Sequence, residues 1–175
     1  MEHYLTKYVN NNEFNVPAMI NDDFFEAIKL CFNAKKYISC AKLLVSFIDT
    51  IGFIKYGNDN RAFKKWLDDY VDLAKLGITS DELWEHRNSL LHMSTLESKK
   101  VLEGKFPILM AYVGRMPEGV ELPDGYKGYN LNELIGEITK GISRFIEDFI
   151  AAEPELFMSR YDLILSDHRY DEYHY

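Results

Sequence analysis

Hydrophobic side chains recur at helical spacing through most of the chain. The strongest stripe begins after Asn130, which can cap a helix with Glu133 three residues on. Two earlier segments have the same period, about 36–55, stopped by Gly57, and about 61–76, stopped by Gly77. The pattern therefore predicts three amphipathic helices. The apolar positions of the last one are Leu134, Ile135, Ile138, Ile142, Phe145, Ile146, Phe149 and Ile150.

Shorter helices are predicted at both ends of the chain. Asn21-Asp22-Asp23 is typical of a helix start, whereas Val16-Pro17 disfavours helix before it. Pro154 ends the last long helix or opens a short terminal one, about 156–164. Gly136 and Gly141 lower helix stability, which predicts close approach of another helix there, in the core or at a dimer seam.

A further helix is expected from Thr79. Thr79 and Glu82 have the spacing of a capping box, and neither Gly nor Pro occurs before Gly104. We therefore expect a helix of roughly 20 to 24 residues that ends at Gly104.

The segment 104–128 has a different pattern. A short apolar run, 106–113, is rich in strand-forming residues, a Gly- and Pro-containing turn follows, and residues 120–122 can pair back. We predict a small hairpin or ordered loop inserted into the helical fold. The fold class is thus all-α, with an antiparallel bundle of four long helices plus short helices in a single domain, 1–175.

Composition narrows the functional classes. The net charge of −8 argues against a general nucleic-acid-binding surface, but leaves room for a small basic pocket near Lys99 and Lys100. Cys31 and Cys40 are expected to be buried free thiols. No secretory signal is visible, and charged residues break the longest apolar run, 41–54, so we expect a cytoplasmic protein without a membrane span.

The candidate chemistry lies in Leu83-Trp84-Glu85-His86-Arg87-Asn88-Ser89-Leu90-Leu91-His92. On a helix, Arg87 falls in line with Leu83 and Leu90, where an uncompensated guanidinium is costly. We therefore expect a carboxylate, carbonyl groups or a phosphate to meet it. Asn88 and His92 are four residues apart, so the amide can orient the imidazole or a ligand. The sequence contains no Gly-rich phosphate loop, nucleophile signature or defensible metal-ligand spacing.

This arrangement of Arg, four residues and His, with Asn after the Arg, resembles the motif of the HEPN superfamily. The resemblance implies a small helical bundle that cleaves RNA without a metal or other cofactor, by attack of the ribose 2′-hydroxyl on the adjacent phosphate. It implies that His92 is the acid or base, that Arg87 stabilises the phosphate and that Asn88 supports them. Lys99 and Lys100 are candidates for binding the substrate.

In this superfamily two protomers commonly pair so that their motifs face one cleft, and we expect a homodimer. The resemblance also suggests a toxin or defence component, with an antitoxin or another protein as partner. Two alternatives stay open at this point. One is a catalytically inactive module that binds a nucleotide or a partner. In the other, Arg87 only captures a buried carboxylate and His92 only donates to a backbone carbonyl.

Overall fold

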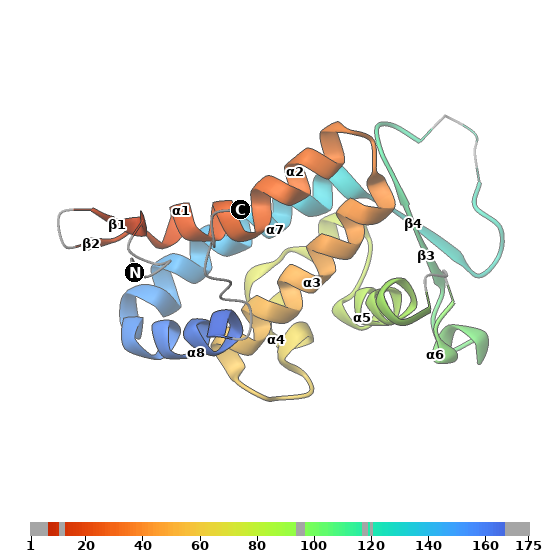
Figure 1. Ribbon diagram of the computed structural model, residues 1–175. Coiled ribbons are helices and arrows are strands. Elements are labelled where there is room, and N and C mark those ends of the chain that lie inside the picture. Colours follow the sequence, from red (N-terminus) through yellow and green to blue (C-terminus); the bar gives the residue numbers. More distant parts are fainter. Residues whose placement is uncertain (1–6, 11–12, 94–96, 117–118, 120, 167–175) are drawn as a thin grey trace, which may run out of the picture.

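The computed structural model describes residues 7–10, 13–93, 97–116, 119 and 121–166, and these are predominantly helical, as predicted (Figure 1). The helices are α1 Val16–Ile20, α2 Glu26–Asn33, α3 Tyr37–Tyr56, α4 Ala62–Tyr70, α5 Ser80–Asn88, α6 Lys99–Leu102, α7 Leu131–Phe145 and α8 Pro154–Ser166. Turns of π-helix lie at η2 Asn21–Phe25, η4 Ser89–Met93 and η5 Ile146–Ile150, and a 3-10 turn lies at η3 Leu73–Leu76. The strands are β1 Val9–Asn10, β2 Glu13–Phe14, β3 Ile108–Tyr112 and β4 Tyr126–Asn130.

The central helix is α3, which packs against α2, α4, α5 and α8. Its side chains at Leu44, Phe47, Ile48, Ile51 and Ile54 are fully buried. Among the described residues, α3 is the helix long and apolar enough to cross a membrane by composition. The same composition suits a core helix, because helices cover it on several sides.

The first helical segment begins earlier than predicted. Asn15 caps α1 by accepting a hydrogen bond from the Ala18 amide at 3.0 Å, and α1, η2 and α2 then continue without a break. Pro17 fits because the first turn of a helix has amides without partners, so the missing N–H costs nothing there. The predicted start at Asn21 is therefore wrong, and Asn21 instead opens a π-turn.

The continuous helix predicted from Thr79 to Glu103 is also wrong. The chain is helical from Ser80 to Met93, but Ser98 is extended and caps the separate helix α6 through the Val101 amide. Residues 94–96, which the prediction also covered, lie outside the described residues.

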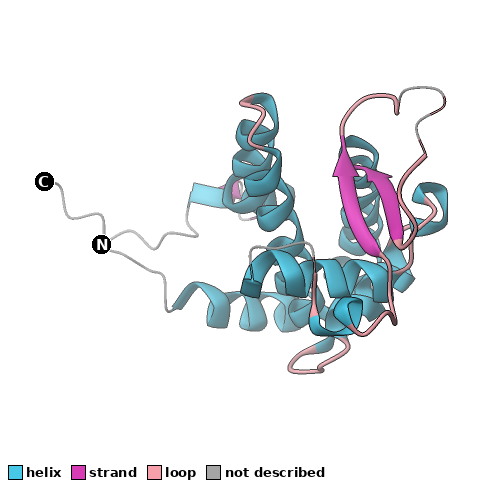
Figure 2. Ribbon diagram, turned by 90° about the vertical axis from the view of Figure 1, so that its right-hand side faces the viewer, coloured by secondary structure: helices cyan, strands magenta, loops and turns pink. Residues whose placement is uncertain are grey.

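The predicted hairpin within 104–128 is replaced by a parallel pair of strands. Ile108 lies opposite Tyr126 and Tyr112 opposite Asn130, and the two strands lie side by side at one end of the molecule (Figures 1 and 2). Parallel pairing needs a long crossover, which residues 113–125 provide. A Cβ on Gly128 would lie 3.1 Å from the side chains of Leu122 and Met116, so its absence makes room for the crossover.

Of the two glycines in α7, one has the predicted close approach. A Cβ on Gly141 would lie 2.9 Å from the Tyr70 carbonyl oxygen and 3.3 Å from the Trp66 ring, both on α4. A Cβ on Gly136 would meet nothing within 4 Å among the described residues. Gly141 therefore sets the distance between α7 and α4.

These two glycines form a matched pair for a stability test. Gly141→Ala should destabilise the protein, because overpacking against backbone costs about 1–3 kcal/mol and exceeds the gain in helix propensity. Gly136→Ala should instead stabilise it by up to about 1 kcal/mol. Urea unfolding of both variants measures the difference, and equal stabilisation by both would contradict the close contact.

Candidate functional site: the Arg87 cluster

The helix that carries the motif is fixed at its start by the predicted capping box. The Glu82 amide donates to Thr79 Oγ1 at 3.2 Å, and the Thr79 amide donates to Glu82 Oε2 at 2.7 Å. The Glu82 carboxylate also accepts hydrogen bonds from Lys127 at 2.7 and 2.9 Å, which ties α5 to β4. The start of α5 is thus held both by its own sequence and by the strand pair.

A π-turn brings Arg87 and His92 together. In a straight α-helix, residues five apart point about 140° away from each other. Here the α-helix ends at Asn88 and Ser89–Met93 form the π-turn η4, whose hydrogen bonds join residues five apart. As a result Arg87 Nη1 lies 3.0 Å from His92 Nε2.

Arg87 is the centre of the cluster. Its Nε donates to Asp49 Oδ2 on α3 at 2.7 Å, and its Nη2 lies 2.7 Å from the same oxygen. Its Nη1 donates to Asn88 Oδ1 at 3.0 Å, and the guanidinium carbon lies 4.9 Å from the centre of the Trp84 ring. Of the three partners expected for Arg87, a carboxylate, carbonyl groups or a phosphate, the structure provides a carboxylate, that of Asp49.

The contact between Arg87 and His92 defines the state of the imidazole. A guanidinium has only donors, so His92 Nε2 must accept this hydrogen bond and carries no proton in this arrangement. His92 is exposed to solvent, so Nε2 is accessible as a proton acceptor once Arg87 Nη1 turns to another partner.

The Asp49–Arg87 pair lies partly out of water, with exposed side-chain fractions of 29% and 18%. Burial raises the pKa of the Asp49 carboxyl above its ordinary value and outweighs Arg87, which lowers it by a hydrogen bond and by its charge. Removing either partner would leave the other charge partly buried without compensation, which is destabilising.

A buried carboxylate, that of Glu85, lies on α5, the helix that carries Arg87. Its oxygens accept hydrogen bonds from Ser98 Oγ at 2.7 Å and from Lys100 Nζ at 2.8 Å. Burial raises the pKa of the Glu85 carboxyl, but hydrogen bonds from Lys100, Ser98 and Asn88 lower it, and the net pKa is below its ordinary value. Asn88 therefore links Glu85 to Arg87.

The two predicted substrate-binding lysines have different surroundings. The Lys100 amine pairs with Glu85, whose side chain is 4% exposed, so much of its charge neutralises a buried carboxylate. Lys99 is exposed at the start of α6 and has no carboxylate partner among the described residues. Their role in binding a substrate stays a prediction.

The neighbouring His86 is not part of the cluster. It is 3% exposed, and its Nε2 lies 3.1 Å from the Tyr129 hydroxyl on β4. Its Nδ1 has no hydrogen-bond partner among the described atoms. Burial lowers the pKa of His86 to about 4, so the ring is neutral at neutral pH and holds α5 against the strand pair.

Sequence reasoning missed Asp49 and Glu85. A signal for Asp49 was present, since it is a lone carboxylate among the apolar positions of the helix 37–56, and Arg87 is a lone cation among those of α5. Nothing in the local pattern distinguishes Glu85 from a solvated residue. In the described part of the chain, no group of three His, Cys, Asp or Glu side chains has the geometry to hold a metal ion.

No protein-family model matches this chain, and no curated protein or solved structure is significantly similar to it.

Burial of neutral His86 predicts a pH dependence of stability. The folded-state pKa of about 4 lies below the ordinary value of 6.5, so the unfolded state binds the proton more tightly. The free energy of unfolding is therefore highest above about pH 6.5, where His86 is neutral in both states. It falls as the pH drops from 6.5 toward the folded-state pKa of about 4, because the unfolded state takes up the proton first. Between about pH 7.5 and pH 5, wild type should lose roughly 2 kcal/mol more unfolding free energy than His86→Gln.

Urea unfolding at the two pH values measures this difference. Titrating carboxylates contribute equally to both proteins and cancel in the comparison. An equal pH dependence of wild type and His86→Gln would contradict a buried neutral imidazole.

Proposed function

We propose that this protein is a metal-independent endoribonuclease of the HEPN type. The observation that carries the proposal is the contact between Arg87 and the unprotonated Nε2 of exposed His92. It joins a phosphate-binding group to a proton acceptor at the spacing of the motif. An antiparallel bundle of four long helices and a cytoplasmic location are parts of the same proposal.

In the proposed reaction, Arg87 Nη1 turns from His92 to the phosphate, and the ribose 2′-oxygen then attacks the adjacent phosphorus while the freed His92 Nε2 accepts its proton. The new bond joins the 2′-oxygen to phosphorus, and the bond from phosphorus to the 5′-oxygen of the next nucleotide breaks. The products are a 2′,3′-cyclic phosphate and a 5′-hydroxyl, whose proton comes from a general acid. No bond is oxidised or reduced, and no water is consumed in this step.

Arg87 supplies the charge for the phosphoryl oxygens. Its planar fork of donors suits two oxygens of a phosphate as negative charge builds on them. Trp84 and Asp49 limit its rotation, and Asn88 fixes Nη1 on the side that faces His92. A phosphate that binds here takes up the free donor capacity of Arg87 and competes with His92 and Asn88 for Nη1.

The reaction needs two proton transfers, one from the 2′-hydroxyl and one to the 5′-oxygen. A single imidazole can carry out only one of them at a time. A homodimer in which two Arg87 clusters share a cleft supplies the second, with His92 of the other copy as the acid for the 5′-oxygen. Closed twofold pairing is the commonest oligomer of soluble proteins. Lys99 and Lys100 are the proposed contacts to the RNA backbone, and an antitoxin-like protein is the proposed regulator.

A second candidate function is a catalytically inactive module that binds a nucleotide or a partner protein. The observation that favours it is the contact of both Nε and Nη2 of Arg87 with Asp49, which leaves little of the guanidinium for a phosphate. The following experiment separates the two candidates.

His92→Ala should reduce cleavage of single-stranded RNA by about 10² to 10⁴-fold, because general acid–base catalysis contributes about that much. The assay contains EDTA and measures cyclic-phosphate ends. The fold should be unaffected, since His92 is exposed and Ala favours helix. Equal cleavage by both proteins would reveal a contaminating nuclease, and no cleavage by wild type would favour the binding module.

Two controls accompany this comparison. Asp81→Asn changes an exposed residue at the other end of α5, paired with Lys64 and outside the cluster, and should retain the wild-type rate. An RNA with a single 2′-deoxyribose at the cleaved position should resist cleavage there, because it lacks the nucleophile.

The composite site predicts a nonlinear response to mixed dimers. If each site needs His92 from both copies, an equal mixture of wild type and His92→Ala after subunit exchange should have about a quarter of the wild-type activity. If each site uses one His92, the activity should be about half. Sedimentation equilibrium establishes the dimer first, and a protein that stays monomeric in it contradicts the composite site.

A further inference from the structure

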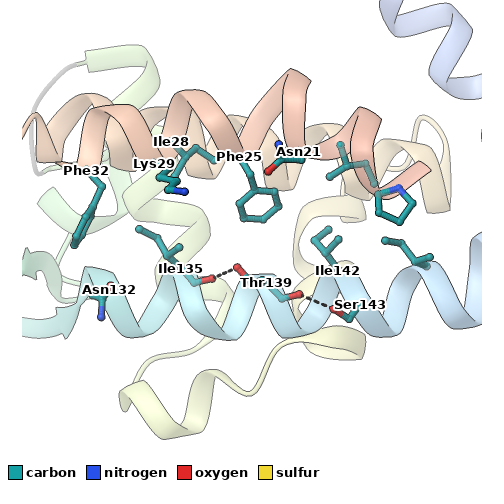
Figure 3. Close-up of a pocket in the computed structure, with 13 residues that line it drawn as sticks. Asn21, Phe25, Ile28, Lys29, Phe32, Asn132, Ile135, Thr139, Ile142 and Ser143 are labelled. Atoms are coloured by element: carbon teal, nitrogen blue, oxygen red, sulfur yellow. Dashed lines mark hydrogen bonds between the residues drawn. The ribbon is translucent and has the colours of Figure 1, made fainter. Parts of the chain in front are cut away.

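A long groove lies between the first helical segment and α7, on elements that the Arg87 cluster does not use. Its volume is about 440 Å³, within the usual range for small-molecule sites. Figure 3 shows side chains from both helices pointing into it. The apolar residues that line it are Pro17, Ile20, Phe25, Ile28, Phe32, Ile135, Ile142 and Ile146.

The two walls run in opposite directions. Phe32 and Asn132 lie at one end of the groove (Figure 3), and Pro17 and Ile146 come from the other ends of the lining segments. Ile20 and Ile28 are only 2% and 1% exposed. The side chains that stay partly exposed in the groove are Phe25, Phe32, Ile135 and Ile146. The helices therefore leave apolar side chains facing each other without closing the space, and burying that surface would be favourable.

Two π-turns form part of the walls. Asn21 and Phe25 belong to η2, and Ile146 begins η5. A π-turn is much rarer than an α-helical turn and is frequently found at functional sites. Neither of these two turns contributes to the Arg87 cluster, so they are unexplained by the proposed function.

The polar groups of the groove favour an anion. Lys29 is the one charged residue among the lining residues, in a chain of net charge −8, and it has no carboxylate partner in the described part of the structure. Figure 3 shows its amine between the helices, beside Phe25. The hydroxyls of Thr139 and Ser143 donate to carbonyls of their own helix at 2.8 and 3.4 Å. They thus offer no donor to a polar ligand.

Lys29 lies toward one end of the groove. Between it and Pro17 at the other end are about 18 Å of helix, at the usual rise per residue. The lining along this length consists largely of Phe25, Ile142 and Ile146 and offers no second charge. A ligand that fits has one acidic end and a long apolar chain.

We propose that this groove binds a long-chain carboxylate, such as a fatty acid. The carboxylate pairs with Lys29, and the chain lies between the two helices toward Pro17 and Ile146. A nucleotide is disfavoured, because the groove has few donors for its many oxygens. This site is independent of the proposed ribonuclease activity.

Dodecanoate competing with a dansylated undecanoic acid probe tests the proposal by fluorescence titration of the full chain. Wild type should bind the probe, and dodecanoate should displace it at lower concentration than dodecanol. Lys29→Glu should weaken the binding of dodecanoate by about fivefold or more. An exposed ion pair contributes up to about 1 kcal/mol, and reversing the charge of residue 29 adds repulsion to the carboxylate. Thr139→Phe should weaken the binding of both dodecanoate and dodecanol, because the larger side chain fills the groove.

Two matched variants control the test. Lys36→Glu makes the same charge change at an exposed position outside the groove, and Thr139→Val removes the hydroxyl without adding volume. Both should bind like wild type. Absence of probe binding, equal displacement by dodecanoate and dodecanol, or unchanged affinity in Lys29→Glu would each overturn the proposal. A shift to dimer that Thr139→Phe abolishes, without probe binding, would assign the groove to a second copy instead.

Discussion

The pairing of Arg87 with Asp49 determines how the motif helix sits on the rest of the molecule. Asp49 lies on the central helix α3, and Arg87 lies among the apolar positions of α5, so each charge is partly withdrawn from water. Neither charge is tolerable there alone. Because both Nε and Nη2 approach one oxygen of Asp49, the pair sets the rotation of the guanidinium as well as its position. The contacts to Asn88 and His92 follow from that rotation.

Glu85 gives α5 a second fixed point on another side. It holds Ser98 and Lys100, so the chain after the motif returns to the helix that carries the motif. Asn88 lies between the two charged groups and interacts with both. Lys100 and Lys127 are both paired with carboxylates of α5, which leaves fewer cations for an RNA backbone than the sequence suggests. A composite cleft would double the number available at one site.

Local signals in the sequence predicted the helix boundaries well where a cap decides them. Thr79, Asn130 and Gly57 each act on their own neighbours, and each does so in the structure. The helix predicted over 61–76 is too long, because α4 ends at Tyr70, Val71 is extended, and Gly77 ends only the 3-10 turn η3. The need of Arg87 for a partner was also predictable, because the cost of a buried guanidinium does not depend on the fold. Asp49 was marked only as a lone carboxylate on an apolar helix. Its contact with Arg87, 38 positions later, depends on the packing of α3 on α5, which no local pattern indicates.

Other features could not be predicted because they depend on contacts far apart in the sequence. The turn-forming residues after Val113 indicated a hairpin, but the crossover packs over Gly128 and makes the strands parallel. Pro17 disfavours helix in the interior, yet the cap at Asn15 places it in a first turn. The three π-turns have no marker in residue type that separates them from α-helix.

The π-turn at Ser89–Met93 also bears on how this motif tolerates insertion and deletion. One extra residue in a helix is accommodated as a π-turn, and removing it restores the regular helix. On a plain α-helix, an Arg and a His with three residues between them would lie on one face of the helix. They could then make the contact that Arg87 and His92 make here across the π-turn. The number of residues between the two is thus coupled to the type of helix between them. A chain that lost one residue from this turn could keep the contact between Arg and His. A chain that kept all four residues between them but formed a regular α-helix would lose it.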